Sequence, residues 1–260
     1  MLDFVDKKFN SNKASKYKLS IQISLDGFLF SIFDANDICV VAKKINTDSN
    51  IDNLFASEPL LTKKYSAVNC IVVTQKSTLV PNNLFDKNKS SEYLKFVCNI
   101  SDEKIFSQKV KKIGAYCVFA VDKNICETVK KYQPRTEFYH QSIPLINSAL
   151  GSFGKNIFVF FDSKTIDIVA NNKEKLLLQN SYKTENINDA IYFVAAVKEQ
   201  LDIVLYNIFL SGKAGKRELE EFLNVFKQAK LEENKNPAFA TIDIEDVSQL
   251  LLLEKLNKCV

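Results

Sequence analysis

Residues 21–42 read IQISLDGFLFSIFDANDICVVA, and residues 157–178 read IFVFFDSKTIDIVANNKEKLLL. When the two stretches are aligned without a gap, Asp26 falls on Asp162 and Asn36 falls on Asn172. Each copy has the pattern of a strand, a tight turn at Asp-Gly or Asp-Ser, a second strand, a turn at Asn and a third strand. A β-meander repeated half a chain apart predicts two similar domains that face each other.

The composition fits two domains and argues against a nucleic-acid partner. A chain of 260 residues suits one large domain or two of about 130 residues. Its 46% hydrophobic residues, with 20 Phe and 9 Tyr, can fill substantial cores. The net charge of +4 is evenly spread, and only Arg135 and Arg217 are arginines among the 35 basic residues. Because arginine is the preferred ligand of phosphates and base edges, we expect no nucleic-acid binding.

The six cysteines and the chain's start predict a reducing compartment. No cysteine pair forms CxxC or a zinc-binding spacing, and Cys39, Cys70 and Cys117 sit in apolar runs, so we expect buried thiols and no metal site. The start, MLDFVDKK, lacks the apolar segment of a signal peptide, and no stretch reaches 18 apolar residues. These features predict a cytoplasmic protein without a transmembrane segment.

The order of expected elements predicts the architecture. A polar lead-in at 1–16 precedes a first domain at 17–150 and a second at 151–260, joined at Gly151–Gly154. The second half reads β-β-β-α-β-α-β-α, with its last strand at Phe239–Ile242 and last helix at Glu245–Leu256. This is the order of a ribonuclease-H-like domain, and two such α/β domains in tandem form the actin-like ATPase architecture.

The first half follows the same plan with a β-rich excursion at about residues 76–110. Within it, the alternating stretches YLKFVCNI at 93–100 and KIFSQKV at 104–110 favour strands. A strand at Tyr116–Val121 and a helix capped by Asp122 are expected to follow the excursion.

Four motifs carry a resemblance that spans nearly the whole chain: LSIQISLDGFLFSI at 19–32, LVPNNLFD at 79–86, FYH at 138–140 and IFLSG at 208–212. They resemble a bacterial family of proteins of unknown function whose structural members adopt an actin-like ATPase fold. More distantly, the plan is similar to actin-like proteins of pilus assembly and secretion, to sugar kinases and to heat-shock chaperones. The resemblance implies a nucleotide cleft, which the loops of this chain match only in part.

The first phosphate loop of that superfamily resembles DxGxT/S, and Asp26 and Gly27 match its start. The bulky Phe28 and Leu29 stand where small residues are required. Asp-Gly is also the strongest ordinary hairpin signal, so a plain turn is the alternative interpretation.

The other two loops have lost more of the pattern. The second phosphate loop resembles DxGGGTxD, but Asp162, Ser163 and Lys164 contain no glycine. Lys164 is either an anion ligand or a solvated turn lysine. The adenosine turn resembles S/T-G-G-x-A, and here Gly212 is kept while Lys213 replaces the second glycine. Gly212 is either part of an anion-binding nest or an ordinary connector between strand and helix.

Chemistry beyond this cleft has few candidates. His140 is the only histidine, so no histidine metal cluster can form, and we expect a structural or capping role for it rather than that of a general base. A nuclease would need about four clustered carboxylates, and Asp162 and Asp167 lie at opposite ends of one short turn. No catalytic residue is therefore assigned.

The glycine count decides between the functional hypotheses. The chain has six glycines in all, about the number that one pair of ATP-binding loops would use. This favours a non-catalytic actin-like scaffold or adaptor that binds a protein partner through the excursion or the interdomain cleft. The alternative is a nucleotide-binding protein, ATPase or kinase with altered loops, in which ATP and Mg²⁺ would be the cofactors.

Overall fold

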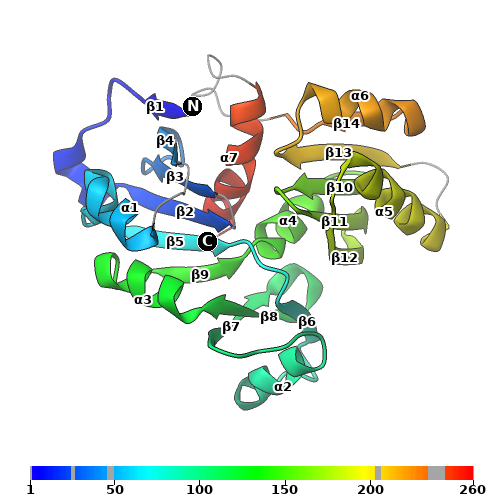
Figure 1. Ribbon diagram of the computed structural model, residues 1–260, viewed down its shortest axis with the longest axis horizontal. Helices are drawn as coiled ribbons and strands as arrows, with labels where there is room; N and C mark the ends of the chain where they lie inside the picture. Colours follow the sequence, from blue (N-terminus) through cyan, green and yellow to red (C-terminus); the bar gives the residue numbers. More distant parts are fainter. Residues whose placement is uncertain (1, 25–26, 46–49, 203–205, 234–243, 260) are drawn as a thin grey trace. The chain divides into compact units, whose positions relative to one another are not determined.

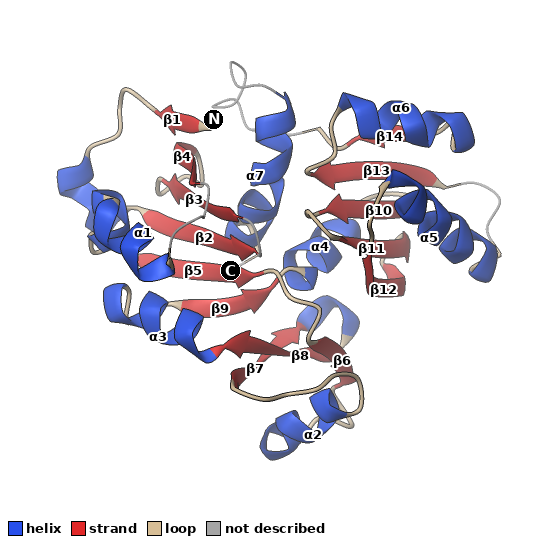
Figure 2. Cartoon of the chain, viewed as in Figure 1, coloured by secondary structure: helices blue, strands red, loops and turns tan. Residues whose placement is uncertain are grey.

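The computed structural model describes residues 2–24, 27–45, 50–202, 206–233 and 244–259. These residues form two compact units (Figures 1 and 2). The first holds residues 2–143 with Leu256–Lys258, and the second holds Pro144–Lys255 with Cys259. Whether each unit is a domain with the predicted boundary at 150 stays a prediction.

The first unit is built on a six-stranded sheet. Its strands are β1 Asp3–Val5, β2 Lys18–Ser24, β3 Gly27–Phe33, β4 Cys39–Ile45, β5 Ala67–Val72 and β9 Glu137–His140. The strand order is β1-β4-β3-β2-β5-β9, antiparallel from β1 to β2 and parallel from β2 to β9. The helical elements of this unit outside the excursion are η1 Ser11–Lys16, α1 Ile51–Ser57, η2 Pro59–Thr62 and α3 Lys123–Tyr132. Part of the predicted lead-in is therefore a strand, because β1 pairs with β4.

The second unit repeats this sheet. Its strands are β10 Lys155–Phe161, β11 Thr165–Asn172, β12 Lys175–Lys183, β13 Asn207–Gly212 and β14 Ala229–Leu231. Their order is β12-β11-β10-β13-β14, with the same change from antiparallel to parallel pairing at the first strand of the meander. Its helices are α5 Ile187–Gln200 and α6 Lys216–Val225, while α4 Ser142–Ala149 precedes the sheet and α7 Ile244–Asn257 follows it. The predicted ribonuclease-H-like order is confirmed in this half.

The repeated meander is matched in its turns as well as its strands. The residues that follow the aligned Asn36 and Asn172 are Asp37 and Lys173, and both adopt the left-handed conformation, with φ of 62° and 53°. Aspartate tolerates this conformation better than most residues, which suits Asp37, whereas Lys173 adopts it without such a preference. The pairing of the second and third strands is irregular near its end in both copies, at Ile32/Phe33 and at Ala170/Asn171.

The excursion forms a small sheet of its own. β6 Ser77–Pro81, β7 Glu103–Val110 and β8 Ala115–Asp122 pair antiparallel in the order β6-β8-β7. The helical segments η3 Lys87–Lys89 and α2 Ser90–Lys95 lie between β6 and β7, and η4 Lys111–Ile113 leads into β8. The excursion therefore includes β8 and extends past the predicted end at residue 110.

The strand predicted at 93–100 is wrong, because the first three residues of this stretch belong to α2. Leu94 is fully buried and Cys98 packs beside it, four residues later, in a cluster with Val80 and Val118. The apolar residues of this stretch fit a helical spacing as well as an alternating one. Asp86 caps the preceding η3 by accepting a hydrogen bond from the Asn88 N–H.

The second unit has a short strand that the sequence did not predict. The described residues place β14 at Ala229–Leu231, parallel to β13, where the sheet needs its fifth strand. The strand predicted at Phe239–Ile242 lies outside the described residues. At three residues, β14 is too short to show alternation in the sequence.

Aromatic rings organise the core of the first unit. Phe28 on β3 meets Phe55 on α1 edge to face, with ring centroids 5.6 Å apart. Phe55 in turn stacks on Tyr132 of α3 at 5.2 Å. Phe28, which stands next to the predicted phosphate loop, is therefore a core residue that packs on α1 directly and reaches α3 through Phe55.

Replacing Phe55 with alanine is expected to cost about 3–5 kcal/mol of unfolding free energy, because it opens a cavity between two rings. Phe55 is fully buried, whereas Phe96, 87% exposed, provides a matched control whose replacement by alanine should cost under about 0.5 kcal/mol. Urea denaturation of both variants measures the difference. Equal losses would contradict the packing described for this unit.

Candidate functional site

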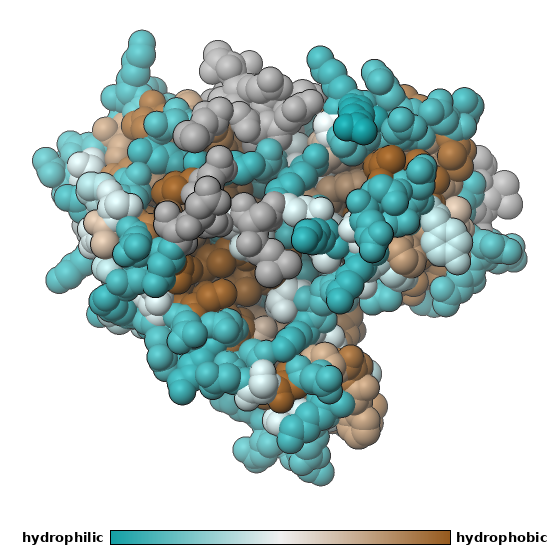
Figure 3. Space-filling view, in the orientation of Figure 1, coloured by the Kyte–Doolittle hydropathy of each residue, from teal (hydrophilic) through white to brown (hydrophobic). Residues whose placement is uncertain are grey.

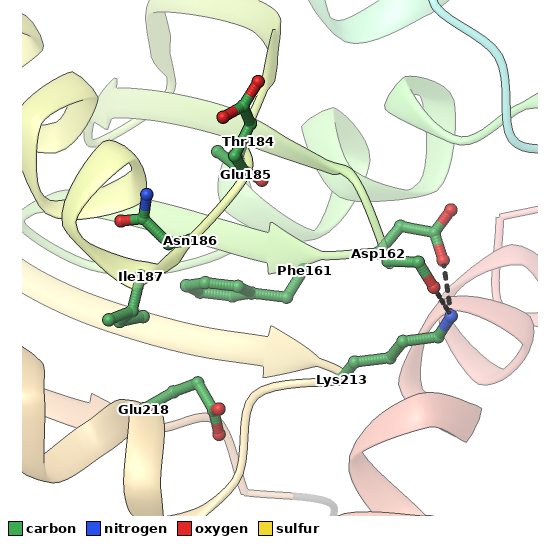
Figure 4. A pocket seen from close by; sticks show the side chains of 9 residues that line it. Phe161, Asp162, Thr184, Glu185, Asn186, Ile187, Lys213 and Glu218 are labelled. Atoms are coloured by element: carbon green, nitrogen blue, oxygen red, sulfur yellow. Dashed lines mark hydrogen bonds and ion pairs between the residues drawn. The ribbon is translucent and has the colours of Figure 1, made fainter.

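The candidate site lies where two parallel strands end together. Phe161 at the end of β10 pairs with Gly212 at the end of β13. In open α/β sheets, ligands bind at this carboxyl edge. A pocket of about 260 Å³ is found here, lined by Phe161, Asp162, Ser163, Thr184, Glu185, Asn186, Ile187, Lys213 and Glu218 (Figure 4).

The turn that follows β10 is too tight to wrap a phosphate chain. The Asp162 N–H donates to the Thr165 carbonyl at 2.9 Å, which leaves only Ser163 and Lys164 as its central residues. The Lys164 carbonyl accepts from the Thr184 N–H at 3.0 Å, so it is held by the next strand connection. The Lys164 side chain is exposed and does not line the pocket.

Lys213 reaches across the strand ends to this turn. Its Nζ lies 3.2 Å from Asp162 Oδ1 and also donates to Ser163 Oγ, as the dashed lines in Figure 4 show. The Asp162 side chain is only 6% exposed, so the ion pair is shielded from water on the carboxylate side. The residue that replaces the second adenosine-turn glycine thus binds the loop where a phosphate would be expected.

Gly212 is required by the sheet itself. Its φ is +80°, and a Cβ built on it would lie 2.2 Å from the Phe161 carbonyl oxygen. The Lys213 N–H donates to that same oxygen at 2.9 Å, which fixes the close approach of the two strands. The geometry of the β10 and β13 ends therefore accounts for this glycine without a ligand.

Both helix N-termini beside the pocket are capped by the chain's own side chains. The Gly215 N–H, at the start of α6, donates to Glu218 Oε2 at 2.9 Å. At α5, Asp189 Oδ2 accepts from the backbone N–H groups of Glu185 and Asn186, at 2.7 and 3.2 Å. A bound phosphate would use such N–H groups, and here each helix start already holds a carboxylate.

The charges of the lining oppose a polyphosphate. The pocket residues include the carboxylates Asp162, Glu185 and Glu218 against one cation, Lys213. In Figure 4 the Glu185 carboxylate points away from Lys213. Glu218 comes from α6, on the opposite side of Phe161 from Glu185. The described residues contain no group of three or more His, Cys, Asp or Glu side chains placed to hold a metal ion.

The corresponding turn of the first unit, between β2 and β3, is described only in part. Asp26 lies outside the described residues, and Gly27 is the first residue of β3. A Cβ on Gly27 would meet Ser24 Oγ at an ordinary 3.7 Å, so nearby atoms do not exclude a side chain there. Whether Asp26, Gly27, Asp162, Ser163, Lys164 or Gly212 binds a ligand stays a prediction.

Seven of the nine residues that line the pocket were not among the predicted site residues, and three of these seven carry charge: Lys213, Glu218 and Glu185. Lys213 follows Gly212 directly, and parallel pairing of the strands is what brings it to Asp162. Glu218 stands three residues after Gly215, the spacing of a helix-capping carboxylate. Glu185 comes just before the α5 cap at Asn186. The capping spacing was visible in the sequence, but the crossing of Lys213 depends on tertiary pairing.

Comparison with known proteins identifies the family and the fold. Residues 6–219 match a family described as proteins of unknown function, DUF3822. The chain belongs to this family. A Bacteroides thetaiotaomicron protein described as having an actin-like ATPase fold and unknown function is 25% identical, with a TM-score of 0.78 over 94% of this chain and 98% of that chain. Among curated proteins, no match was found.

More distant structures agree on the fold alone. The PilM-PilN type IV pilus biogenesis complex is 9% identical, with a TM-score of 0.59 over 93% of this chain and 98% of that chain. The ethanolamine utilization protein EutJ from Carboxydothermus hydrogenoformans is 11% identical, with a TM-score of 0.51 over 92% and 88%. The predicted actin-like ATPase fold is confirmed.

His140, a second candidate from the sequence, is enclosed in the core of the first unit. Its Nε2 donates to the Thr74 carbonyl at 2.9 Å, and its Nδ1 accepts from Ser142 Oγ at 2.7 Å and from the Ser142 N–H at 3.2 Å. The residue is fully buried, and burial lowers its pKa to about 4 despite the bond to Thr74. Nearby, burial raises the pKa of the Cys117 thiol to about 12. Both groups are therefore neutral at pH 7, with His140 hydrogen-bonded at the start of α4.

Replacing Gly212 with alanine is expected to unfold or severely destabilise the second unit, because the Cβ would overlap the Phe161 carbonyl. Gly154 is the matched control: its φ is +86°, yet nothing lies within 4 Å of its Cβ position. Its alanine variant should lose only about 1–2 kcal/mol, the cost of the left-handed conformation. Thermal unfolding of both variants makes the comparison, and similar losses would refute the close approach.

The buried neutral His140 should make stability depend on pH. His140 takes up a proton near pH 6.5 in the unfolded chain and only near pH 4 in the folded chain. Its contribution to the free energy of unfolding is therefore complete above pH 6.5 and is lost as the pH falls towards 4. The loss amounts to about 3 kcal/mol over that window. Urea denaturation at several pH values should show a shallower slope for His140→Gln, and an unchanged slope would contradict the assignment.

Proposed function

We propose that this chain is a non-catalytic actin-like scaffold or adaptor. The observation that carries the proposal is the contact of Lys213 with Asp162 and Ser163 at the shared end of β10 and β13. A nucleotide phosphate placed there would have to displace this cation from a nearly buried carboxylate. The Asp162 carboxylate, without Lys213, would then lie beside the negatively charged phosphate, and this arrangement costs free energy.

The helix starts support the same conclusion. Glu218 and Asp189 place a carboxylate at each helix start, where it accepts from the N–H groups of Gly215, Glu185 and Asn186 and would repel a bound anion. Phosphoryl transfer depends almost entirely on positioning and on positive charge around the phosphates. The described pocket offers one lysine, and that lysine is engaged by its neighbours.

A protein-binding role is compatible with this fold. One structural neighbour is part of a complex, PilM-PilN, although at 9% identity it supports the fold and nothing more specific. No helix within the described ranges has both the length and the apolar character required to span a bilayer. We propose a cytoplasmic protein that acts by binding another protein.

A nucleotide-binding protein with altered loops is the second candidate. The observation in its favour is the position of the pocket, at the carboxyl edge where such folds bind ligands. In that case ATP would have to bind without glycine-rich loops.

A thermal-shift experiment separates the two candidates. With 5 mM ATP and Mg²⁺ we expect no change in Tm, with Mg²⁺ alone and adenosine as controls. A ligand present at 100 times its Kd would add about 2.7 kcal/mol and raise Tm by several degrees. Such a rise, or release of phosphate from ATP, would overturn the scaffold proposal.

A further inference from the structure

The excursion carries large apolar side chains that are exposed. Leu84, Phe96 and Val97 are 65%, 87% and 57% exposed. Figure 3 shows hydrophobic surface at this end of the molecule, beside β6. Large apolar side chains that are exposed together on a protein surface mark an interaction site.

Tyr93 holds the two parts of this surface together. Its Oη donates to the Leu84 carbonyl at 2.7 Å and accepts from the Asp86 N–H at 2.8 Å, which ties the loop after β6 to α2. Phe96 is the C-cap residue of α2 and Val97 follows it, so both come within four residues of Tyr93 in the sequence. We call Leu84, Tyr93, Phe96 and Val97 the excursion patch.

Stacked aromatic rings support the excursion patch. Phe85 stacks on Tyr116 of β8 with centroids 3.8 Å apart and contacts Tyr93 at 6.1 Å. Lys109 Nζ lies 5.9 Å from the Tyr116 ring. The patch is thus presented on a fixed base, which lowers the entropic cost of binding.

The surroundings of the patch are basic. Residues 76–112 contain eight lysines and four acidic residues, a net charge of +4. The positive charge of the chain is therefore concentrated in this stretch, and the expectation of an evenly spread charge is wrong. Glu103 is engaged by Lys76. Seven of these eight lysines are exposed, and Lys87, Lys89 and Lys95 lie between Leu84 and Phe96 in the sequence.

We propose that the excursion patch is the docking surface for an acidic segment of a partner protein that carries an apolar anchor side chain. The proposal deepens the scaffold function and rests on it. An apolar centre with a charged rim is the usual anatomy of a protein interface. The lysine rim would attract carboxylates and speed the encounter.

Other occupants fit the charges less well. A second copy bound through the same patch would bring two surfaces of net charge +4 together. Residues 76–112 contain no arginine, the residue preferred for nucleic-acid phosphates.

Site-specific photo-crosslinking in cells of the source organism tests the proposal. A benzophenone amino acid replaces Phe96 in one full-length variant and Tyr192, a 67% exposed aromatic residue of the second unit, in another. We expect a discrete protein adduct at position 96, joined through a segment rich in Asp and Glu. Adding Lys87→Glu, Lys89→Glu and Lys95→Glu should remove it, whereas Lys155→Glu, Lys175→Glu and Lys183→Glu, on exposed lysines of the second unit, should leave it unchanged.

The cross-linked segment is then synthesised as a labelled peptide and its binding is measured by fluorescence anisotropy. Phe96→Ser and the Lys87/Lys89/Lys95 charge reversal should each weaken binding at least tenfold, with unchanged thermal unfolding. Loss of affinity with added salt is expected.

Several outcomes overturn the docking surface: no protein adduct at position 96, an adduct that survives the charge reversal, or cross-linking to lipid, to nucleic acid or to a second copy. A protein adduct at position 192 alone would leave the scaffold function standing and place docking elsewhere. ATP turnover would instead refute the proposed function while leaving the peptide measurement to decide on the patch.

Discussion

The close approach of β10 and β13 is the constraint on which the candidate site depends. The Phe161 carbonyl accepts a hydrogen bond from the Lys213 N–H and leaves no room for a side chain on Gly212. This contact fixes the direction in which the chain leaves β13, and so it places the Lys213 ammonium on Asp162. Without that placement the Asp162 carboxylate would lie at the strand ends without its cation partner.

The two units share one sheet topology, but the connections that follow their parallel strands differ. In each unit an antiparallel meander meets two parallel strands in the same order. In the second unit the connection from β13 to α6 is three residues long and begins with Lys213, and the capping Glu218 follows in the first turn of α6. In the first unit, the corresponding connection between β5 and α3 contains the three-stranded excursion. The two copies keep a common frame while their connections differ in content.

The sequence predicted the frame well and the site poorly, for physical reasons. The meander was visible because Asp and Asn mark its turns and apolar residues mark its strands, and Asp122 caps α3 as expected. The stretch at 93–100 was misread because Leu94 and Cys98 satisfy both a helical and an alternating pattern. Lys213 could not be assigned, since its contact with Asp162 joins residues that meet only after β10 and β13 pair.

The excursion begins after β5 and returns through β8 directly into α3, whose first residue, Lys123, follows the end of that strand. Its entry and exit therefore lie between two consecutive elements of a frame that the other half completes without any such addition. A module inserted in this way can change length, charge or shape through mutation while the parent sheet keeps its pairing. Divergence among relatives should accordingly concentrate in this segment, and each relative could acquire its own recognition properties there.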